Sequence, residues 1–234
     1  NVKMISIRRE EKRGITKTTW LESAHSFSFG NYYDPENMGF GALRVINDDK
    51  IVPGGGFAMH GHKNIEIFTC VLQGALAHRD SLGNGSIIRP GDVQLMSAGS
   101  GIRHSEFNAS ASEPVHLLQI WIAPERAGTE PSYQQASFDI SPGRFQTVIS
   151  PGGQNGALDI KSDARIAMAR LAPGGEVAFV AESARAYYLH VARGAVDFGR
   201  QKMKSGDALA LRGEAGAFAF ASGEGAELLL FDLP

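Results

Sequence analysis

Two short triplets contain the residues in this 234-residue chain that are best suited to bind a metal ion. Residues 60–62 read His-Gly-His, and residues 104–106 read His-Ser-Glu. Because residues i and i+2 of a β-strand project from the same face, each triplet can direct its first and third side chains towards one point. Two such strands side by side would offer three imidazoles and one carboxylate. That set binds a divalent first-row metal and leaves coordination positions open, as metal-dependent oxygenases require.

The sequence around the triplets favours short strands joined by tight turns. Three glycines at 54–56 precede the first triplet and permit a close backbone approach or a positive φ. An apolar run at 65–72 follows the triplet, and Gly74 stands just beyond it. An Arg-Pro-Gly-Asp turn at 89–92 and a loop of small residues at 97–101 then lead to the second triplet.

This arrangement resembles the two motifs of the cupin superfamily, in which a hairpin and a second strand of a small β-barrel carry the histidines. Within that superfamily, the chain is similar to the pirin family. The stretches that carry the resemblance are residues 25–29 (HSFSF), 31–35 (NYYDP), 38–49 and 101–106 (GIRHSE). The similarity spans essentially the whole chain and is densest between Trp20 and Trp121. It is strongest towards the bacterial pirins that are associated with quercetin 2,3-dioxygenase activity.

The resemblance implies which side chains bind the metal. The general cupin pattern takes its fourth ligand from the glutamate of the first motif, which is Glu66 here, whereas the pirin pattern takes it from Glu106. We therefore expect one metal ion to be bound by His60, His62, His104 and Glu106. Glu106 is also expected to act as the catalytic base, and Glu66 to orient the ligands from behind them.

The donor set does not identify the metal. Three imidazoles and one carboxylate suit Fe(II), Ni(II), Cu(II), Mn(II) or Zn(II), and availability often decides among these ions. Iron is the first expectation.

Composition and an internal duplication predict the fold class. Glycine and proline account for 28 and 10 residues, which suits many short strands and turns better than a helical bundle. The sequence at 71–78 is echoed at 191–198, and the sequence at 89–95 is echoed at 204–210. Such a duplication, together with the resemblance to cupins, predicts an all-β bicupin with two antiparallel jelly-roll barrels in one chain.

The two barrels are expected to differ in function. Residues 1–130 would form the N-terminal, metal-binding domain and residues 131–234 the C-terminal domain, with a linker at 124–131. In the second copy, Val180 and Glu182 stand at the positions of the first triplet's histidines. The C-terminal domain therefore lacks these ligands, and we expect it to be structural.

Four local predictions concern the surroundings of the site. A first strand is expected at 4–9 and another at 42–47, which an acidic turn at 48–50 would close. The loop at 31–41 is expected near the barrel mouth, where it could also line a pocket. His25 lies in an aromatic stretch, where a role in a pocket is possible but is not the favoured interpretation.

Charge and composition exclude several classes of partner. The formal net charge is −2 and the chain has no long run of Lys or Arg, so nothing marks a surface for nucleic acid. The single cysteine, Cys70, excludes an internal disulfide. No segment approaches the ~20 consecutive apolar residues of a membrane span, and the charged N-terminus lacks the apolar region of a signal peptide. We therefore expect a cytoplasmic protein that contacts neither nucleic acid nor membrane.

Two functions from different classes agree with these residues. As an enzyme, the protein would be a metal-dependent dioxygenase that takes O2 and a small phenolic substrate, a flavonol such as quercetin or a similar enolizable phenol. As a regulatory module, it would sense redox state through its metal and bind a protein partner without catalysis, as the resemblance to eukaryotic pirins suggests. No docking motif is evident in the sequence, which favours the enzyme.

Overall fold

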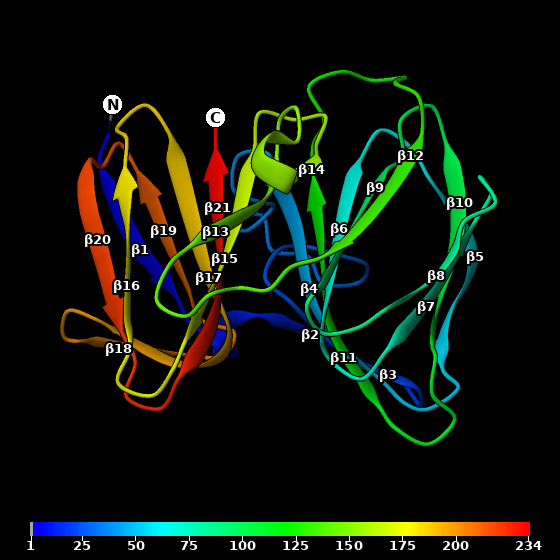
Figure 1. Ribbon diagram of the computed structural model, residues 1–234, viewed down its shortest axis with the longest axis horizontal. Coiled ribbons are helices and arrows are strands. Elements are labelled where there is room, and N and C mark those ends of the chain that lie inside the picture. The colour runs from blue at the N-terminus through cyan, green and yellow to red at the C-terminus, as the bar shows by residue number, and fades with distance from the viewer. Residues whose placement is uncertain (1) are drawn as a thin grey trace. The chain divides into compact units, whose positions relative to one another are not determined.

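The computed structural model describes residues 2–234, and almost all of its regular structure is β-strand (Figure 1). Contacts between Cα atoms divide the chain into two compact units. The first, which we call the histidine unit, consists of Arg13–Phe138 and Ile160–Ser162. The second, which we call the terminal unit, consists of the N-terminal segment through Lys12 together with Asp139–Asp159 and Asp163–Pro234. The all-β prediction is confirmed.

Within the described residues, the histidine unit contains two antiparallel sheets. The larger has seven strands in the order β12-β9-β6-β11-β4-β3-β2, and the smaller has four in the order β5-β10-β7-β8. The larger sheet contains β2 (Gly14–Lys17), β3 (Leu21–His25), β4 (Leu43–Ile51), β6 (Glu66–Gln73), β9 (Asp92–Ser97), β11 (Val115–Ile122) and β12 (Ser132–Ser137). The smaller contains β5 (Gly56–His62), β7 (Leu76–Asp80), β8 (Gly85–Ile88) and β10 (Ile102–Asn108).

Strand β10 shows how the alternation of side chains positions the second triplet. Every second residue of β10 is buried, including His104 and Glu106, while the residues between them are more exposed. Both candidate ligands of this triplet therefore face inwards, as their spacing predicted. An apolar cluster supports the unit, and it consists of Ile51, Val71, Leu76, Ile88, Val115 and Leu117.

Strand β4 is longer than the sequence predicted, because it continues through the acidic residues that were expected to form a turn. It pairs along its length with β11 on one side, and from Asn47 to Ile51 with β3 on the other. Its two acidic side chains lie on opposite faces: Asp48 pairs with Arg13 and His116, and Asp49 accepts a hydrogen bond from Ser23 on Oδ1. These partners offset part of the cost of placing carboxylates in a central strand. The predicted end of this strand at residue 47 is wrong, since β4 continues to Ile51.

The terminal unit is built on a ten-stranded sheet in which β1-β19-β17-β21-β15-β13-β14 form a continuous path. Strands β16, β18 and β20 join this sheet off the path. The strands are β1 (Met4–Arg8), β13 (Gln146–Ser150), β14 (Leu158–Asp159), β15 (Arg165–Leu171), β16 (Glu176–Ala181), β17 (Ala186–Phe198), β18 (Gln201–Lys204), β19 (Ala208–Arg212), β20 (Gly216–Ala221) and β21 (Ala226–Leu233).

Aromatic side chains occupy the core of the terminal unit. Phe179 stacks on Phe218 and Phe220, with ring centroids 5.8 and 6.2 Å apart. Val180, which stands where the duplication would place a histidine, is 72% exposed. The helical content of residues 2–234 is confined to two 3-10 turns, η1 (Glu10–Lys12) and η2 (Gln154–Gly156), so no helix among them has the length and apolar character needed to cross a membrane.

The boundaries of the units differ from the expected division at residue 130. Strand β1 belongs to the terminal unit, where it pairs antiparallel with β19 (Figure 1). The histidine unit runs on to Phe138, because β12 pairs with β9. It also takes Ile160–Ser162 from the C-terminal half of the chain. Pairing between distant strands sets these boundaries, and a sequence pattern does not reveal it.

The internal duplication is visible in two equivalent turns. Gly91 and Gly206 both have positive φ, at 92° and 89°, in the turns that lead into β9 and β19. In each turn, the following aspartate accepts a 2.9 Å hydrogen bond from the backbone N–H three residues earlier. Only Asp207 of the second turn also accepts from Arg9 Nη1, at 3.2 Å, and from the Glu10 N–H, at 2.7 Å. It thereby fastens the N-terminal segment to the terminal unit.

We expect Asp207→Ala to lower the free energy of unfolding by about 3 kcal/mol, because a buried carboxylate that accepts charge-assisted hydrogen bonds is lost and Arg9 is left without it. Asp92→Ala, in the equivalent but more exposed turn, is the matched control and should cost about 1 kcal/mol. Urea denaturation of both variants measures the difference. Equal losses would contradict an anchoring role for Asp207.

Candidate metal centre

The two triplets lie on neighbouring antiparallel strands, β5 and β10. His104 is paired with His60 in this register, and His62 lies two residues further along β5. A β-bulge interrupts the pairing between His104 and Glu106, so that Glu106 is opposite Phe57. The predicted convergence of the three histidines is therefore produced by strand pairing, and the bulge re-aims the carboxylate relative to them.

The three imidazoles point their Nε2 atoms at one another. Nε2 of His104 lies 2.9 Å from Nε2 of His62 and 2.9 Å from Nε2 of His60. His60 donates its Nδ1–H to the Ala58 carbonyl at 2.7 Å, which leaves the lone pair on its Nε2. Among residues 2–234, these histidines form the one set of three or more His, Cys, Asp or Glu side chains whose ligand atoms all lie within 4.8 Å of one another.

Burial keeps two of these imidazoles neutral. Burial, with the nearby His60, lowers the pKa of His62 to about 4. Burial also lowers the pKa of His104 to about 3, and the neighbouring His62, His60 and His78 act in the same direction. A neutral imidazole is the form that binds a metal, so both rings are ready to bind one at neutral pH.

The spacing and the unpaired atoms fit a divalent metal ion. Two nitrogen ligands ~2.1 Å from one ion and about 90° apart lie ~3.0 Å from each other, close to the spacing observed here. Within the described residues, Nδ1 of His104 and Oε2 of Glu106 are buried without a hydrogen-bond partner. An ion among the three Nε2 atoms would also remove the mutual repulsion of their lone pairs.

Glu106 lies at the edge of the histidine group. Its Oε1 is 3.5 Å from Nε2 of His104 and accepts a 2.8 Å hydrogen bond from Nε2 of Gln119. Burial raises the pKa of Glu106 to about 7; the bond from Gln119 opposes this rise, and the charge of Asp49 adds to it. Gln119 in turn accepts from the Trp121 indole N–H at 3.3 Å. Both residues were missed in the sequence, although they share the inward-facing side of β11.

Glu66 does not lie where the sequence placed it. Strand β5 ends at His62, Asn64 takes a positive φ of 53°, and Glu66 begins β6 in the other sheet. There its Oε1 accepts hydrogen bonds from Ser97 Oγ at 2.9 Å and from the Lys161 N–H at 2.7 Å. These contacts tie Glu66 to β9 and to the segment at 160–162, and its expected orienting role stays a prediction.

A cavity of about 380 Å³ opens beside the histidines. His60, His62 and Glu106 form part of its wall. The remaining lining residues are the apolar Leu21, Phe29, Phe57 and Trp121, the polar Thr16, Ser23, His25, Asn47, Asp49 and Gln119, and the loop residues Gly30 and Asn31. Its volume falls within the ~300–1,000 Å³ typical of small-molecule sites.

Aromatic rings connect the histidines to the far wall of this cavity. The Trp121 ring packs edge-on against His62 and against Phe29, with centroids 5.2 and 5.4 Å apart. Phe29 stacks on His25 at 5.3 Å. His25 therefore lines the pocket, contrary to the sequence prediction, and Asn31 shows that the loop at 31–41 contributes to the same wall.

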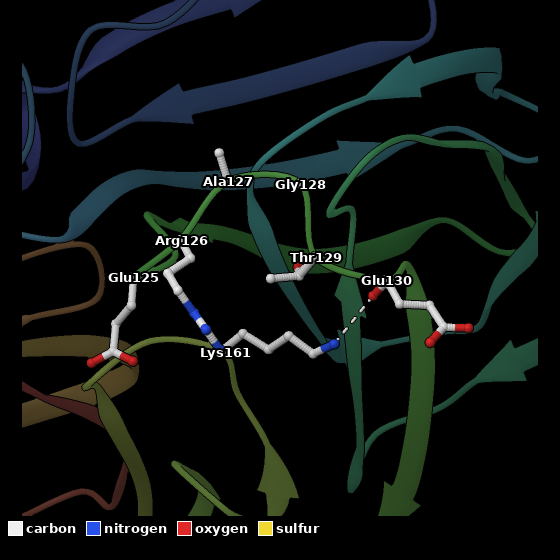
Figure 2. A pocket seen from close by; sticks show the side chains of 7 residues that line it. All are labelled: Glu125, Arg126, Ala127, Gly128, Thr129, Glu130 and Lys161. Carbon is white, nitrogen blue, oxygen red and sulfur yellow. Dashed lines mark hydrogen bonds between the residues drawn. The ribbon is translucent and has the colours of Figure 1, made fainter.

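A second cavity, of about 560 Å³, is formed by the loop at 125–130 and Lys161 and shares no lining residue with the first (Figure 2). Lys161 Nζ donates to the Glu130 carbonyl at 3.1 Å, and the Glu125 N–H donates to the Lys161 carbonyl at 2.9 Å. The predicted linker is thus folded into the histidine unit. Two acidic and two basic side chains line this cavity, which gives no preference for an ion of either sign.

Comparisons with known proteins agree with this geometry. Residues 7–122 match the family described as Pirin, and residues 147–233 match the family described as Quercetinase C-terminal cupin domain. The fold is therefore that of a bicupin, and the chain belongs to the pirin family.

Relatives resemble the chain over nearly its whole length. Quercetin 2,3-dioxygenase of Escherichia coli K12 is 44% identical over 231 residues, which cover 99% of each chain. A pirin-like protein of Caulobacter vibrioides is 41% identical and covers 98% of this chain and 99% of its own. The crystal structure of the bacterial pirin YhhW from Escherichia coli in complex with nickel(II) superposes with a TM-score of 0.93 at 43% identity and covers 99% of both chains.

The first prediction from this geometry concerns metal content. His60→Ala/His104→Ala removes two of the three converging nitrogens, so we expect less than about a tenth of an equivalent of bound metal after purification. His116→Ala is the matched control, because this histidine pairs with Asp48 on the other face of the sheet, and it should keep a full equivalent. Elemental analysis decides the matter, and a full equivalent in the double variant would refute the site.

A second prediction concerns Asp49, whose pKa burial raises from 3.8 to about 7, with an opposing hydrogen bond from Ser23 and a reinforcing charge on Asp48. Between these values the folded protein keeps a proton that the unfolded chain has released, so stability falls as the pH rises. Asp49→Asn removes this ionisation and keeps an oxygen for Ser23. The variant should match the wild type near pH ~4 and become progressively more stable up to about pH 7.

Urea denaturation across this pH range measures the effect. A stability difference between Asp49→Asn and the wild type that does not grow with pH would contradict the raised pKa.

Proposed function

We propose that the protein is a metal-dependent dioxygenase that acts on flavonols such as quercetin, or on similar enolizable phenols. One divalent transition metal would be held by His60, His62, His104 and Glu106. Iron is our first choice, with nickel, copper, manganese or zinc as alternatives. The observation that carries the proposal is the convergence of three Nε2 atoms, 2.9 Å from His104 to each neighbour, beside a cavity that Phe29, Phe57 and Trp121 help to line.

The relatives support the same chemistry. The Escherichia coli protein that is 44% identical over nearly the full length bears the name quercetin 2,3-dioxygenase. The nickel(II) complex of the similar structure supports a divalent ion in a fold of this kind.

Within this proposal, the residues of the chain have distinct tasks. When bound, the metal supplies Lewis acidity and, for a redox-active ion, an exchange of electrons with O2. Glu106 takes the proton of the substrate hydroxyl on Oε2, because Oε1 is already engaged by Gln119. Glu106 is buried, and this burial raises its pKa in the protein without an ion.

The aromatic wall binds and shields the substrate. Trp121, Phe29 and Phe57 offer ring surfaces to a planar polycyclic phenol. Trp121 also holds the oxygen of Gln119, so the wall that contacts the substrate fixes the orientation of the base. Burial of Glu106 keeps bulk water from competing for its carboxylate.

Oxygen uptake tests the function directly. Protein loaded with Fe(II) without air, with its metal content measured, should consume about one O2 for each quercetin that disappears. Parallel samples loaded with Ni(II), Cu(II), Mn(II) and Zn(II) rank the alternative metals. A loaded protein that binds quercetin and consumes no O2 with any of these ions would overturn the enzyme proposal and favour the regulatory alternative.

Glu106→Gln tests the assignment of the base. The amide keeps the shape and one oxygen but cannot accept the proton, so turnover at saturating metal should fall by on the order of 10²–10⁴-fold. Glu66→Gln is the matched control, because Glu66 hydrogen-bonds Ser97 and Lys161, and it should turn over within about threefold of the wild type. Normal turnover by Glu106→Gln with none by Glu66→Gln would reverse the assignment of the acid.

A further inference from the structure

The cavity has a second polar wall, which belongs to the other sheet. Ser23 and His25 on β3 and Asn47 and Asp49 on β4 face into it, whereas the histidine triplets lie on β5 and β10. In the register of the larger sheet, His25 is paired with Asn47 and Ser23 with Asp49. All four residues are at most 3% exposed. A ligand in the cavity would therefore meet buried polar groups on both sheets.

His25 fixes the orientation of the Asn47 amide. The ring lies 2.7 Å from Asn47 Oδ1 through its Nδ1 and 2.8 Å from Thr16 Oγ1 through its Nε2. Because the Asn47 oxygen can only accept, Nδ1 carries the proton and Nε2 accepts from the Thr16 hydroxyl. Burial lowers the pKa of His25, which keeps the ring in this neutral form. Both ring nitrogens are thus engaged, and the Asn47 NH2 group is left to face elsewhere.

Two hydrogen-bonding groups on this wall have unused capacity. Asn47 uses its oxygen for His25, and Asp49 uses Oδ1 for Ser23. Within residues 2–234, no side-chain hydrogen bond occupies Asn47 Nδ2 or Asp49 Oδ2. The wall therefore offers one donor group and one acceptor at the surface of the cavity, two residues apart on the same face of β4.

Asp48 lies between Asn47 and Asp49 in the sequence but on the opposite face of β4, and its carboxylate has two side-chain partners. Asp48 pairs with Arg13 at 3.1 Å and with His116 at 2.5 Å. A ligand that covers this donor and acceptor takes them out of contact with water, and only a ligand with matching groups replaces the hydrogen bonds that are lost. Such an arrangement rejects an analogue that lacks the matching group, because the protein groups then stay unpaired.

We propose that Asn47 and Asp49 form a hydroxyl-recognition subsite for a phenolic ring of the substrate, separate from the group that meets the histidines. A ring hydroxyl there accepts from Asn47 Nδ2 and donates to Asp49 Oδ2. This inference rests on the proposed function, since it assumes that an aromatic polyphenol occupies the cavity. It narrows the substrate class to polycyclic phenols hydroxylated at both ends.

Ligand binding without turnover tests the subsite. Protein loaded with Ni(II) is titrated without O2 at pH ~8, above the pKa of Asp49, so that its carboxylate can accept. The ligands are quercetin, whose pendant ring carries two hydroxyls, and the otherwise identical flavonol that has none on that ring. Quenching of tryptophan fluorescence reports each Kd. The wild type should bind quercetin at least about 10-fold more tightly, the worth of a hydrogen bond to a buried charged or polar group.

Three variants separate recognition from general damage. Asp49→Asn removes the acceptor and Asn47→Asp removes the donor, and each should reduce the preference to less than about threefold. The double variant Asn47→Asp/Asp49→Asn exchanges donor and acceptor. Because a hydroxyl can both donate and accept, this exchange should restore most of the preference. Asp48→Asn, on the opposite face of β4, is the control and should keep the preference of the wild type.

The outcomes distinguish this inference from the proposed function. It is overturned if the wild type shows no preference or binds neither flavonol, if either single variant keeps the preference, or if the double variant recovers none of it. These binding constants need no catalysis. Absence of O2 uptake alongside the expected pattern of preferences would therefore overturn the dioxygenase proposal and leave the subsite standing.

Discussion

The centre of this protein depends on three nitrogens that cannot satisfy one another. Nε2 of His104 lies 2.9 Å from Nε2 of both His60 and His62, and a single proton can serve only one such contact. The hydrogen bond from His60 to the Ala58 carbonyl commits that ring to presenting a lone pair. The paired strands β5 and β10 must therefore hold mutually repelling atoms together. A cation placed among them turns this repulsion into attraction.

Much of the site followed from side-chain periodicity, and the rest depended on long-range pairing. Period-2 alternation was enough to place His60, His62 and His104 on one inner surface. It failed for Glu66, because the chain breaks at Asn64 and starts a strand of another sheet. No local pattern signalled that break, and the general cupin pattern and the pirin pattern assign different carboxylates to this place.

Local composition misled in a different way at the acidic residues of β4. Asp48 and Asp49 have the composition of a turn, yet their partners come from β3, from β11 and from the chain just before β2, all distant in sequence. The pairing of β3 with β4 also places His25, which the sequence shows only as part of an aromatic stretch, in the wall of the cavity. The polar residues of the cavity wall can therefore be identified only once the register of the sheet is known, because the register decides which side chains face the cavity.

The assignment of β1 to the terminal unit affects how this chain can be divided. Strand β19 has β1 on one side and β17 on the other, so a fragment that begins after residue 12 would convert β19 into an open sheet edge. An open edge presents unpaired backbone groups to other chains and invites aggregation. The histidine unit, conversely, would lose the Lys161 N–H that Glu66 accepts if the chain ended at its last strand. Each unit contains segments that the other unit separates in the sequence, so no single cut in the chain yields two complete units.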